Sequence, residues 1–225
     1  MMSILSTRSL DKTQMSMLKN AGISIETYDA ISITHLNTEI PTAFSHYIFT
    51  SKNGVRAYLK NRKEYLPHPD ELLCYCVGEK TKSLLEEKGL KVVKMTNNAS
   101  ELAHFIVNES EKGPFLVFTG NRNRPDLGNI LRQNGISFRE IKGYETHLNP
   151  HSFECEFSCI LFYSPSGINS FLTANKPGNS MAICIGETTA KEARKHFIKV
   201  KIADKATTDA VLDKLIEIYP TLAIT

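Results

Sequence analysis

Short apolar segments alternate along this chain with longer segments in which apolar residues recur every three or four positions. The short segments end in Gly, Ser, Thr or Asn and predict strands, and the longer ones predict amphipathic helices. We expect strands at 3–7, 46–51, 72–78, 91–95, 113–120, 159–164 and 181–186. We expect helices at 12–22, 53–62, 79–89, 100–110, 125–135, 165–173, 187–197 and 207–219, with Ser100 as the N-cap of the fourth. Strands that alternate with helices predict parallel sheets built from right-handed crossovers.

The same succession of residues occurs twice along the chain. Phe49 and Phe162, Ser51 and Ser164, and Gly54 and Gly167 are pairs separated by 113 residues, and Gly78 and Gly186 are separated by 108. Thr-His-Leu-Asn occurs at 34–37 and again at 146–149. Ordered matches at nearly constant spacing indicate an internal duplication of one α/β unit.

The composition is that of an ordinary globular protein, because 41% of the 225 residues are hydrophobic and 23% are charged. The net charge of +3 is too small to predict binding to nucleic acid or to a membrane. No segment is long and apolar enough to span a bilayer, and Arg8 and Asp11 come too early for a secretory leader. We therefore expect a cytoplasmic protein, and a monomer, since no long exposed apolar stripe is apparent.

The cysteines and histidines do not form metal-binding patterns. Cys74, Cys76 and Cys184 lie inside apolar segments, which predicts buried free thiols in a reducing compartment. Cys155 and Cys159 lack a second pair at the spacing of a zinc site. We expect no metal.

Hydroxyl and glycine residues concentrate where predicted strands meet predicted helices. In an open parallel sheet, ligands bind beyond the carboxyl ends of the strands, and the free N–H groups at helix starts attract anions. For each position on its own, plain helix capping is the favoured explanation, so the repetition is what favours a site for carboxylates or phosphates. The positions are Thr50, Ser51, Asn53, Gly78, Thr119, Gly120, Ser164, Ser166, Gly186, Thr188 and Thr189.

Three common ligand or catalytic motifs are missing from the sequence. No Gly-x-Gly-x-x-Gly follows the first strand, and no Gly-Lys-Ser/Thr follows the segment TGNRNRPDLG. No Gly-x-Ser-x-Gly elbow occurs either. A dinucleotide site, a nucleoside triphosphate site and an α/β-hydrolase are therefore unsupported.

Taken in order, five segments resemble the uroporphyrinogen-III synthase family over nearly the whole chain: FTSKNGV (49–55), CVGEKTKSLLEEKG (76–89), VFTGNRNRPDLGNILRQNGISFREIKGYET (117–146), FYSPSGINSF (162–171) and IGETTAKEA (185–193). The resemblance implies two flavodoxin-like, doubly wound parallel-sheet domains joined by a two-stranded linker, with the active cleft between them. The implied domains are 1–35 plus 150–225 and 38–142, with linkers at 36–37 and 143–149. The residues alone favour a cut near Gly113 instead, where the repeat begins.

The resemblance also implies a reaction. The enzyme closes hydroxymethylbilane, a linear tetrapyrrole, into uroporphyrinogen III, inverting the terminal pyrrole ring with loss of water, as a hydro-lyase of haem biosynthesis. The pyrroles supply their own electrons, so neither a metal nor an organic cofactor is expected. A transient contact with the preceding pathway enzyme is a further expectation. The alternative reading is a non-catalytic two-lobed α/β binding protein for a small anionic ligand.

Two residues match cleft positions of that family. Tyr144 is implied as a group that could donate a proton or hydrogen bond to the departing hydroxyl, although packing between domains explains it equally well. Thr189 is implied as a carboxylate-binding residue. The other expected substrate contacts are Arg8, Thr50, Ser51, Asn53, Gly78, Thr81, Thr119, Gly120, Arg122, Ser164 and Ser166, with Arg124 as a further candidate partner for acetate or propionate groups.

Overall fold

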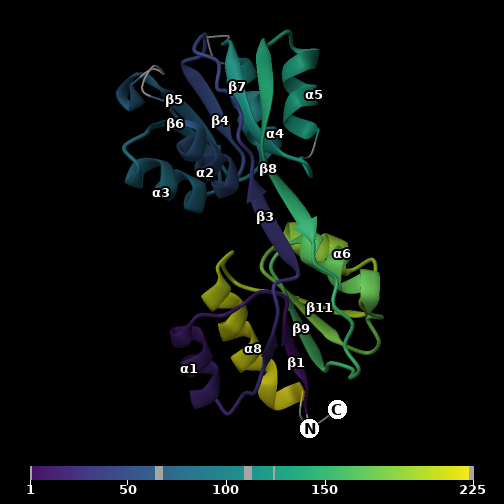
Figure 1. Cartoon of the computed structure of the whole chain (residues 1–225). Coiled ribbons are helices and arrows are strands. Elements are labelled where there is room, and N and C mark those ends of the chain that lie inside the picture. Colours follow the sequence, from purple (N-terminus) through teal and green to yellow (C-terminus); the bar gives the residue numbers. More distant parts are fainter. Residues whose placement is uncertain (1, 64–67, 109–112, 124, 223–225) are drawn as a thin grey trace. The chain divides into compact units, whose positions relative to one another are not determined.

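The computed structural model describes residues 2–63, 68–108, 113–123 and 125–222 (Figure 1). By its internal contacts the chain divides into two compact units. The discontinuous unit comprises Met1–Ser32 and His147–Thr225, and the middle unit comprises Ile33–Thr146. The alternative cut near Gly113 falls inside the middle unit, so the compact units do not coincide with the sequence repeats.

The discontinuous unit is built on a five-stranded sheet with the order β11-β10-β9-β1-β2. Its neighbouring strands are parallel, with Leu5 opposite Ile160 and Ala182 opposite Ile160 on the other side. The strands are β1 (Ile4–Ser6), β2 (Glu26–Thr27), β9 (Cys159–Phe162), β10 (Met181–Cys184) and β11 (Lys199–Ile202). The helices are α1 (Lys12–Asn20), α6 (Pro165–Ala174), α7 (Glu187–Ala193) and α8 (Thr208–Leu222).

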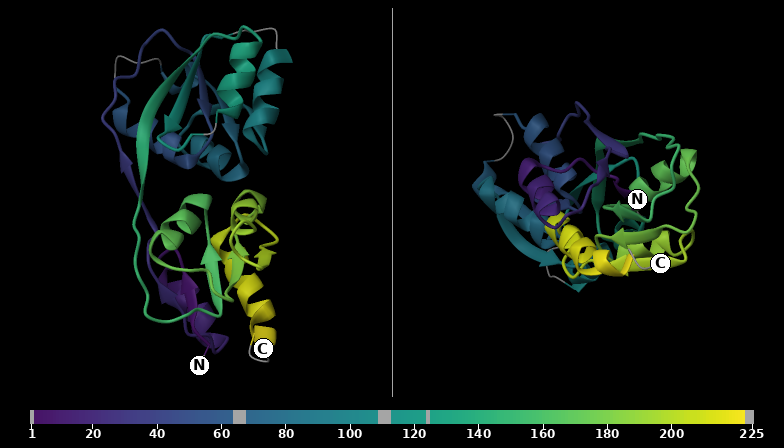
Figure 2. Two further views of the ribbon diagram at one scale, coloured as in Figure 1. Left: turned by 90° about the vertical axis from the view of Figure 1, so that its right-hand side faces the viewer. Right: turned by 90° about the horizontal axis from the view of Figure 1, so that it is seen from below.

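Successive strand residues point to opposite sides of the sheet, so these apolar strands present an apolar surface on both faces. Helices cover both faces. Leu5 and Phe162 pack with Phe171 of α6 on one face. Ile4 packs with Leu18 of α1 on the other, where α1 and α8 lie side by side (Figure 2). Burial on both faces explains why these strands are short, uninterrupted apolar segments.

The middle unit is built on a six-stranded sheet with the order β3-β8-β7-β4-β5-β6. The strands are β3 (Ile31–His35), β4 (His46–Phe49), β5 (Leu73–Val77), β6 (Lys91–Thr96), β7 (Phe115–Gly120) and β8 (Phe138–Leu148). The helices are α2 (Lys52–Asn61), the 3-10 turn η1 (Pro69–Glu71), α3 (Glu79–Glu87), α4 (Ala99–Asn108) and α5 (Asp126–Gln133). In Figure 1, α4 and α5 lie together on one face of the sheet and α2 and α3 on the other, in agreement with two separate apolar clusters.

The two sheets share one strand arrangement, which reflects the duplication. The order β2-β1-β9-β10-β11 corresponds to β8-β7-β4-β5-β6. The β1-α1-β2 segment comes first along the discontinuous unit, whereas its equivalent, β7-α5-β8, comes last along the middle unit. The expected α/β class with parallel doubly wound sheets is therefore confirmed.

Residues expected as linkers lie at the edge of the six-stranded sheet. β3 is the neighbour of β8 there, and the Leu36 N–H donates to the Gly143 carbonyl at 2.9 Å. The buried Asn61 side chain donates to the Leu36 carbonyl at 2.9 Å and accepts from the Thr38 N–H at 2.9 Å. These contacts are why residues 33–37 group with the middle unit.

The start of α4 differs from the expected one. The helix begins at Ala99, and the Asn98 carboxamide accepts the Glu101 N–H at 2.9 Å, so Ser100 is not the N-cap. The Glu101 carboxylate accepts from Asn98 and from the Asn97 N–H in return, which favours Asn98 as the cap. Residues 109 and 110 of the predicted helix lie outside the described residues. Within the part of the chain described, no helix has the length and apolar character needed to cross a membrane.

Candidate functional site

The carboxyl edge of the middle sheet holds a serine-capped corner between β4 and α2. Ser51 has an extended backbone, with φ −160° and ψ 160°, and its Oγ accepts the Gly54 N–H at 3.4 Å. Thr50 precedes it, and Asn53 follows in the first turn of α2, where its Oδ1 accepts from Arg56 at 3.5 Å. Ser51 therefore caps α2 at the strand ends, and a helix N-terminus favours an anion.

Tyr144 of β8 lies at the same edge. Its phenol oxygen is 3.0 Å from Ser51 Oγ, and either group is able to donate. Gly120 pairs with Tyr144 across β7 and β8, and a Cβ at Gly120 would lie 2.7 Å from the Tyr144 Cζ. Only a glycine leaves room for the ring at this position. The structure thus brings three predicted residues, Ser51, Gly120 and Tyr144, into contact.

The remaining predicted positions of the middle unit vary in exposure. The Thr119 side chain is buried, and its hydroxyl donates to the Ile141 carbonyl at 3.3 Å. Thr81 is buried in the first turn of α3, which Gly78 precedes with φ +83°. Arg122 is exposed after β7, and the candidate Arg124 lies outside the described residues. Thr81 and Thr119 therefore face the interior of the unit, and their contact with a ligand stays a prediction.

The discontinuous unit has an equivalent corner between β9 and α6. Ser164 has φ −165° and ψ 158°, and its Oγ accepts the Gly167 N–H at 3.1 Å. Ser166 is half-buried in the first turn of α6. Thr189 is buried in α7, and its N–H donates to the Gly186 carbonyl at 3.1 Å. Ser164 thus acts as the helix cap that the sequence allowed, and the role of Thr189 toward a ligand stays a prediction.

A partly buried tyrosine that the sequence did not single out lies beside this corner. Tyr163 OH is 3.2 Å from Ser6 Oγ, and the same Ser6 hydroxyl donates to the Arg8 carbonyl at 2.6 Å. Burial raises the pKa of Tyr163 to about 12, and the Ser6 hydrogen bond and the Arg8 charge lower it in part. The predicted Arg8 is exposed two residues after the end of β1.

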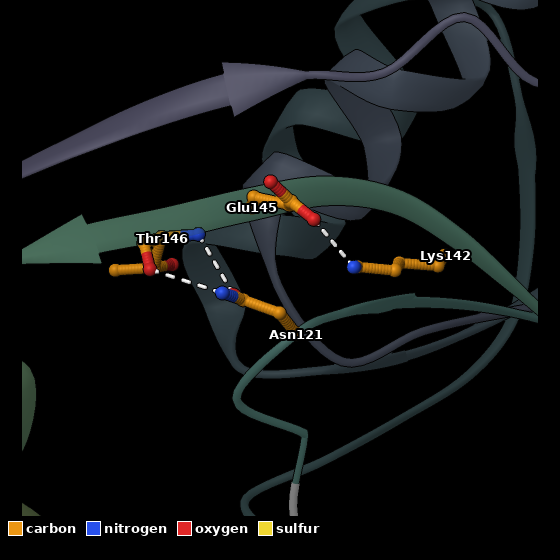
Figure 3. Close-up of polar contacts among 4 residues, drawn as sticks. All are labelled: Asn121, Lys142, Glu145 and Thr146. Carbon is orange, nitrogen blue, oxygen red and sulfur yellow. Dashed lines mark hydrogen bonds and ion pairs between the residues drawn. The ribbon is translucent and has the colours of Figure 1, made fainter.

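Asn121 is a second residue that the sequence did not single out (Figure 3). Its Oδ1 accepts the Thr146 N–H at 2.8 Å, and its Nδ2 donates to the Thr146 carbonyl at 3.1 Å. An ion pair between Lys142 and Glu145 lies beside it on β8. An Asn directly after the strand-ending Gly120 is the only signal that the sequence carries for this contact.

The site residues do not include a metal-binding cluster. Among the described residues, no group of three or more His, Cys, Asp or Glu is placed to hold an ion. Cys74, Cys76, Cys159 and Cys184 are buried free thiols, and burial raises the pKa of Cys184 to about 12, which keeps it in the unreactive thiol form.

Two doubly wound sheets with serine-capped, glycine-containing corners at their carboxyl edges define a two-unit α/β protein suited to an anionic small molecule. A sequence profile described as uroporphyrinogen-III synthase HemD matches residues 15–213. The chain is also 31% identical over 191 residues to "Porphyrin biosynthesis protein HemD" of Ruminiclostridium josui, across 76% of this chain and 37% of that protein. The chain therefore belongs to the uroporphyrinogen-III synthase family, and the expected resemblance is confirmed.

Solved structures agree on the fold. Uroporphyrinogen-III synthetase from Helicobacter pylori 26695 matches 97% of this chain and all of its own, with a TM-score of 0.71 and 24% identity. A mutant uroporphyrinogen III synthase from Thermus thermophilus matches all of both chains, with a TM-score of 0.70 and 15% identity. The chain spans 37% of the length of the Ruminiclostridium josui protein, which extends well beyond the matched part.

Proposed function

We propose that this chain is a lyase that converts hydroxymethylbilane to uroporphyrinogen III. The C–O bond of the terminal hydroxymethyl group breaks, water leaves, and the adjacent pyrrole supplies the electron pair that stabilises the cation. The cation then bonds to the substituted α-carbon of the pyrrole at the other end of the chain, and the C–C bond from that carbon to its original bridge breaks. The freed bridge carbon bonds to the other α-carbon of the same ring, which loses a proton, so the macrocycle closes with that ring inverted. Membership of the uroporphyrinogen-III synthase family supports this reaction.

The contact between Ser51 and Tyr144 is the observation that carries the proposal. A phenol held by one hydrogen bond at 3.0 Å, at the carboxyl edge of the sheet, can donate its proton toward a departing hydroxyl. When Ser51 donates to the phenol oxygen, the Tyr144 O–H points elsewhere and is available to the leaving group. The phenol thus assists the departure of water in this proposal.

Polar and charged groups near the strand ends are the proposed anchors for the substrate carboxylates. In the middle unit these are Asn53 and Arg122, and in the discontinuous unit they are Arg8 and Ser166. Guanidinium groups and helix-start N–H groups both favour carboxylates. Their function is to hold the flexible tetrapyrrole in the one conformation that gives the inverted product.

The test uses purified protein and freshly prepared hydroxymethylbilane, followed by oxidation and chromatographic separation of the type I and type III isomers. We expect type III product well above a control without enzyme. Type I alone at the spontaneous rate, from protein that circular dichroism shows to be folded, would contradict the proposal and favour a binding protein. We also propose that the protein is a cytoplasmic monomer that contacts the preceding enzyme transiently. Sedimentation analysis tests its oligomeric state.

A further inference from the structure

We infer that Asn121 is a positioning residue that fixes the Tyr144 phenol by holding the backbone of β8 at Thr146. The inference rests on the proposed function, because it assigns Asn121 a role in the chemistry of Tyr144. The hydrogen bonds of its side chain go to the backbone of Thr146. It acts through the strand that carries the tyrosine.

Tyr144 lies where the pairing of β8 with β7 is irregular. Thr119 pairs with Lys142, but the next residue, Gly120, pairs with Tyr144, so Gly143 is an extra residue on β8. Such a bulge re-aims the following side chain and weakens the local ladder. The direction of the Tyr144 ring therefore depends on contacts beyond the regular sheet.

Two anchors outside the β7–β8 ladder hold the backbone on either side of Tyr144. On one side the Gly143 carbonyl accepts the Leu36 N–H at 2.9 Å. On the other the Asn121 side chain makes both hydrogen bonds to Thr146, at 2.8 Å and 3.1 Å. Since β7 ends at Gly120, this amide supplies the donor and acceptor that a further strand residue would have supplied (Figure 3).

Steric contacts complete the positioning of the phenol. A Cβ at Gly143 would lie 2.7 Å from the Ala57 Cβ, so β8 approaches α2 as closely as glycine allows. Ser51 caps that same helix and contacts the phenol. Because residues 144 and 146 point to the same side of a strand, a shift at Thr146 moves Tyr144 with it.

A double-mutant cycle tests the inference. Asn121→Ala should lower kcat about tenfold with little change in KM, because misplacing a catalytic group by a fraction of an ångström costs roughly that much. In the Tyr144→Phe background, the same Asn121→Ala change should alter kcat less than about twofold, since the group it positions is gone. An equal loss in both backgrounds, or no loss in the native background, would overturn the inference.

Asn175 provides a matched control in the discontinuous unit. Its side chain also holds a passing segment, accepting the Phe153 N–H at 3.0 Å and donating to the His151 carbonyl at 2.6 Å. Asn175→Ala should lower stability, and its effect on kcat should be the same in the native and the Tyr144→Phe backgrounds. A tenfold loss of kcat in Asn175→Ala that Tyr144→Phe abolishes would overturn the specific role of Asn121.

Amide hydrogen exchange separates failure of this inference from failure of the proposed function. Asn121→Ala should speed exchange of the Thr146 amide at least tenfold, while the amides of α2 keep their rates. Unchanged exchange at Thr146 would overturn the positioning contact whatever the activity. Native protein that forms no type III isomer would instead reject the proposed function, independently of the exchange result.

Discussion

The corner after β4 in the middle unit and the corner after β9 in the discontinuous unit share one backbone geometry. Ser51 and Ser164 are both extended, and each accepts a hydrogen bond from a glycine N–H three residues later. Their polar neighbours differ: Ser51 contacts the Tyr144 phenol, whereas Tyr163, the phenol next to Ser164 in the chain, contacts Ser6. The duplicated corners have therefore kept the backbone that orients a helix, while the side chains around it diverged.

The glycines at the two corners also differ in their surroundings. A Cβ at Gly54 would lie 3.2 Å from the Phe118 carbonyl oxygen and 3.3 Å from the Phe118 Cβ. At Gly167 the nearest atom is Thr7 Oγ1, at 3.5 Å, which is ordinary van der Waals contact. Equivalent residues in the sequence thus carry different packing constraints, and substitutions in matched pairs measure the difference.

The largest expected effect on stability concerns the Tyr163 phenol at alkaline pH. Its pKa is raised from 10.0 to about 12 in the folded protein, so its contribution is complete below pH 10 and is lost as the pH rises toward 12. Between pH 10 and 12 the unfolding free energy of the native protein should therefore fall by about 2 to 3 kcal/mol because of this phenol. Tyr163→Phe should not show this part of the fall. Urea unfolding at pH 8, 10 and 11.5 measures it, and identical pH profiles would contradict a buried structural phenol. The pKa values of Tyr28 and Tyr47 are also raised to about 12. Since the native protein and the Tyr163→Phe variant both contain these two residues, the difference between their pH profiles reports Tyr163.

The next effect distinguishes the two corner glycines. Gly54→Ala should destabilise the protein by about 2 kcal/mol, because the added methyl group meets the backbone and side chain of Phe118. Gly167→Ala should change stability by less than about 0.5 kcal/mol or raise it slightly, since alanine favours the helix. Thermal unfolding of both variants gives the comparison. Equal destabilisation would mean that the two corners are equally crowded.

The smallest expected effect concerns the glycines that precede α3 and α7. Gly78 has φ +83° and ψ 142°, a region that side chains disfavour, whereas Gly186 is extended with φ 179°. Gly78→Ala should therefore lower the unfolding free energy by about 1 to 2 kcal/mol, whereas Gly186→Ala should leave it almost unchanged. Chemical unfolding of the two variants checks this, and a larger loss in Gly186→Ala would contradict it.

Much of the fold can be predicted from the local sequence pattern, and the matched serines and glycines show which features cannot. The alternation of apolar and amphipathic segments predicts the parallel sheets, and Ser51 and Ser164 are caps because their type and position suit capping. Gly78 and Gly186 stand in nearly identical local sequences but differ in φ. Backbone strain of this kind depends on tertiary packing, so the sequence does not reveal it.

The polar contacts of the site depend on pairing between distant segments. The contact between Ser6 and Tyr163 spans 157 residues, and the one between Ser51 and Tyr144 spans 93. The Asn121 contact with Thr146 depends on the bulge at Gly143, for which the only local signal is a lone glycine within a strand segment. Family resemblance identified Tyr144 as a candidate, but its partners became visible only with the strand register.

The most direct test of the account compares Tyr144→Phe with Tyr163→Phe on freshly prepared hydroxymethylbilane. Both changes remove one phenol hydroxyl that contacts a serine, one in each unit. We predict that Tyr144→Phe lowers kcat for type III isomer formation about a hundredfold, while Tyr163→Phe stays within about threefold of the native protein. Equal losses, or a loss confined to Tyr163→Phe, would contradict the assignment of the chemistry to Tyr144.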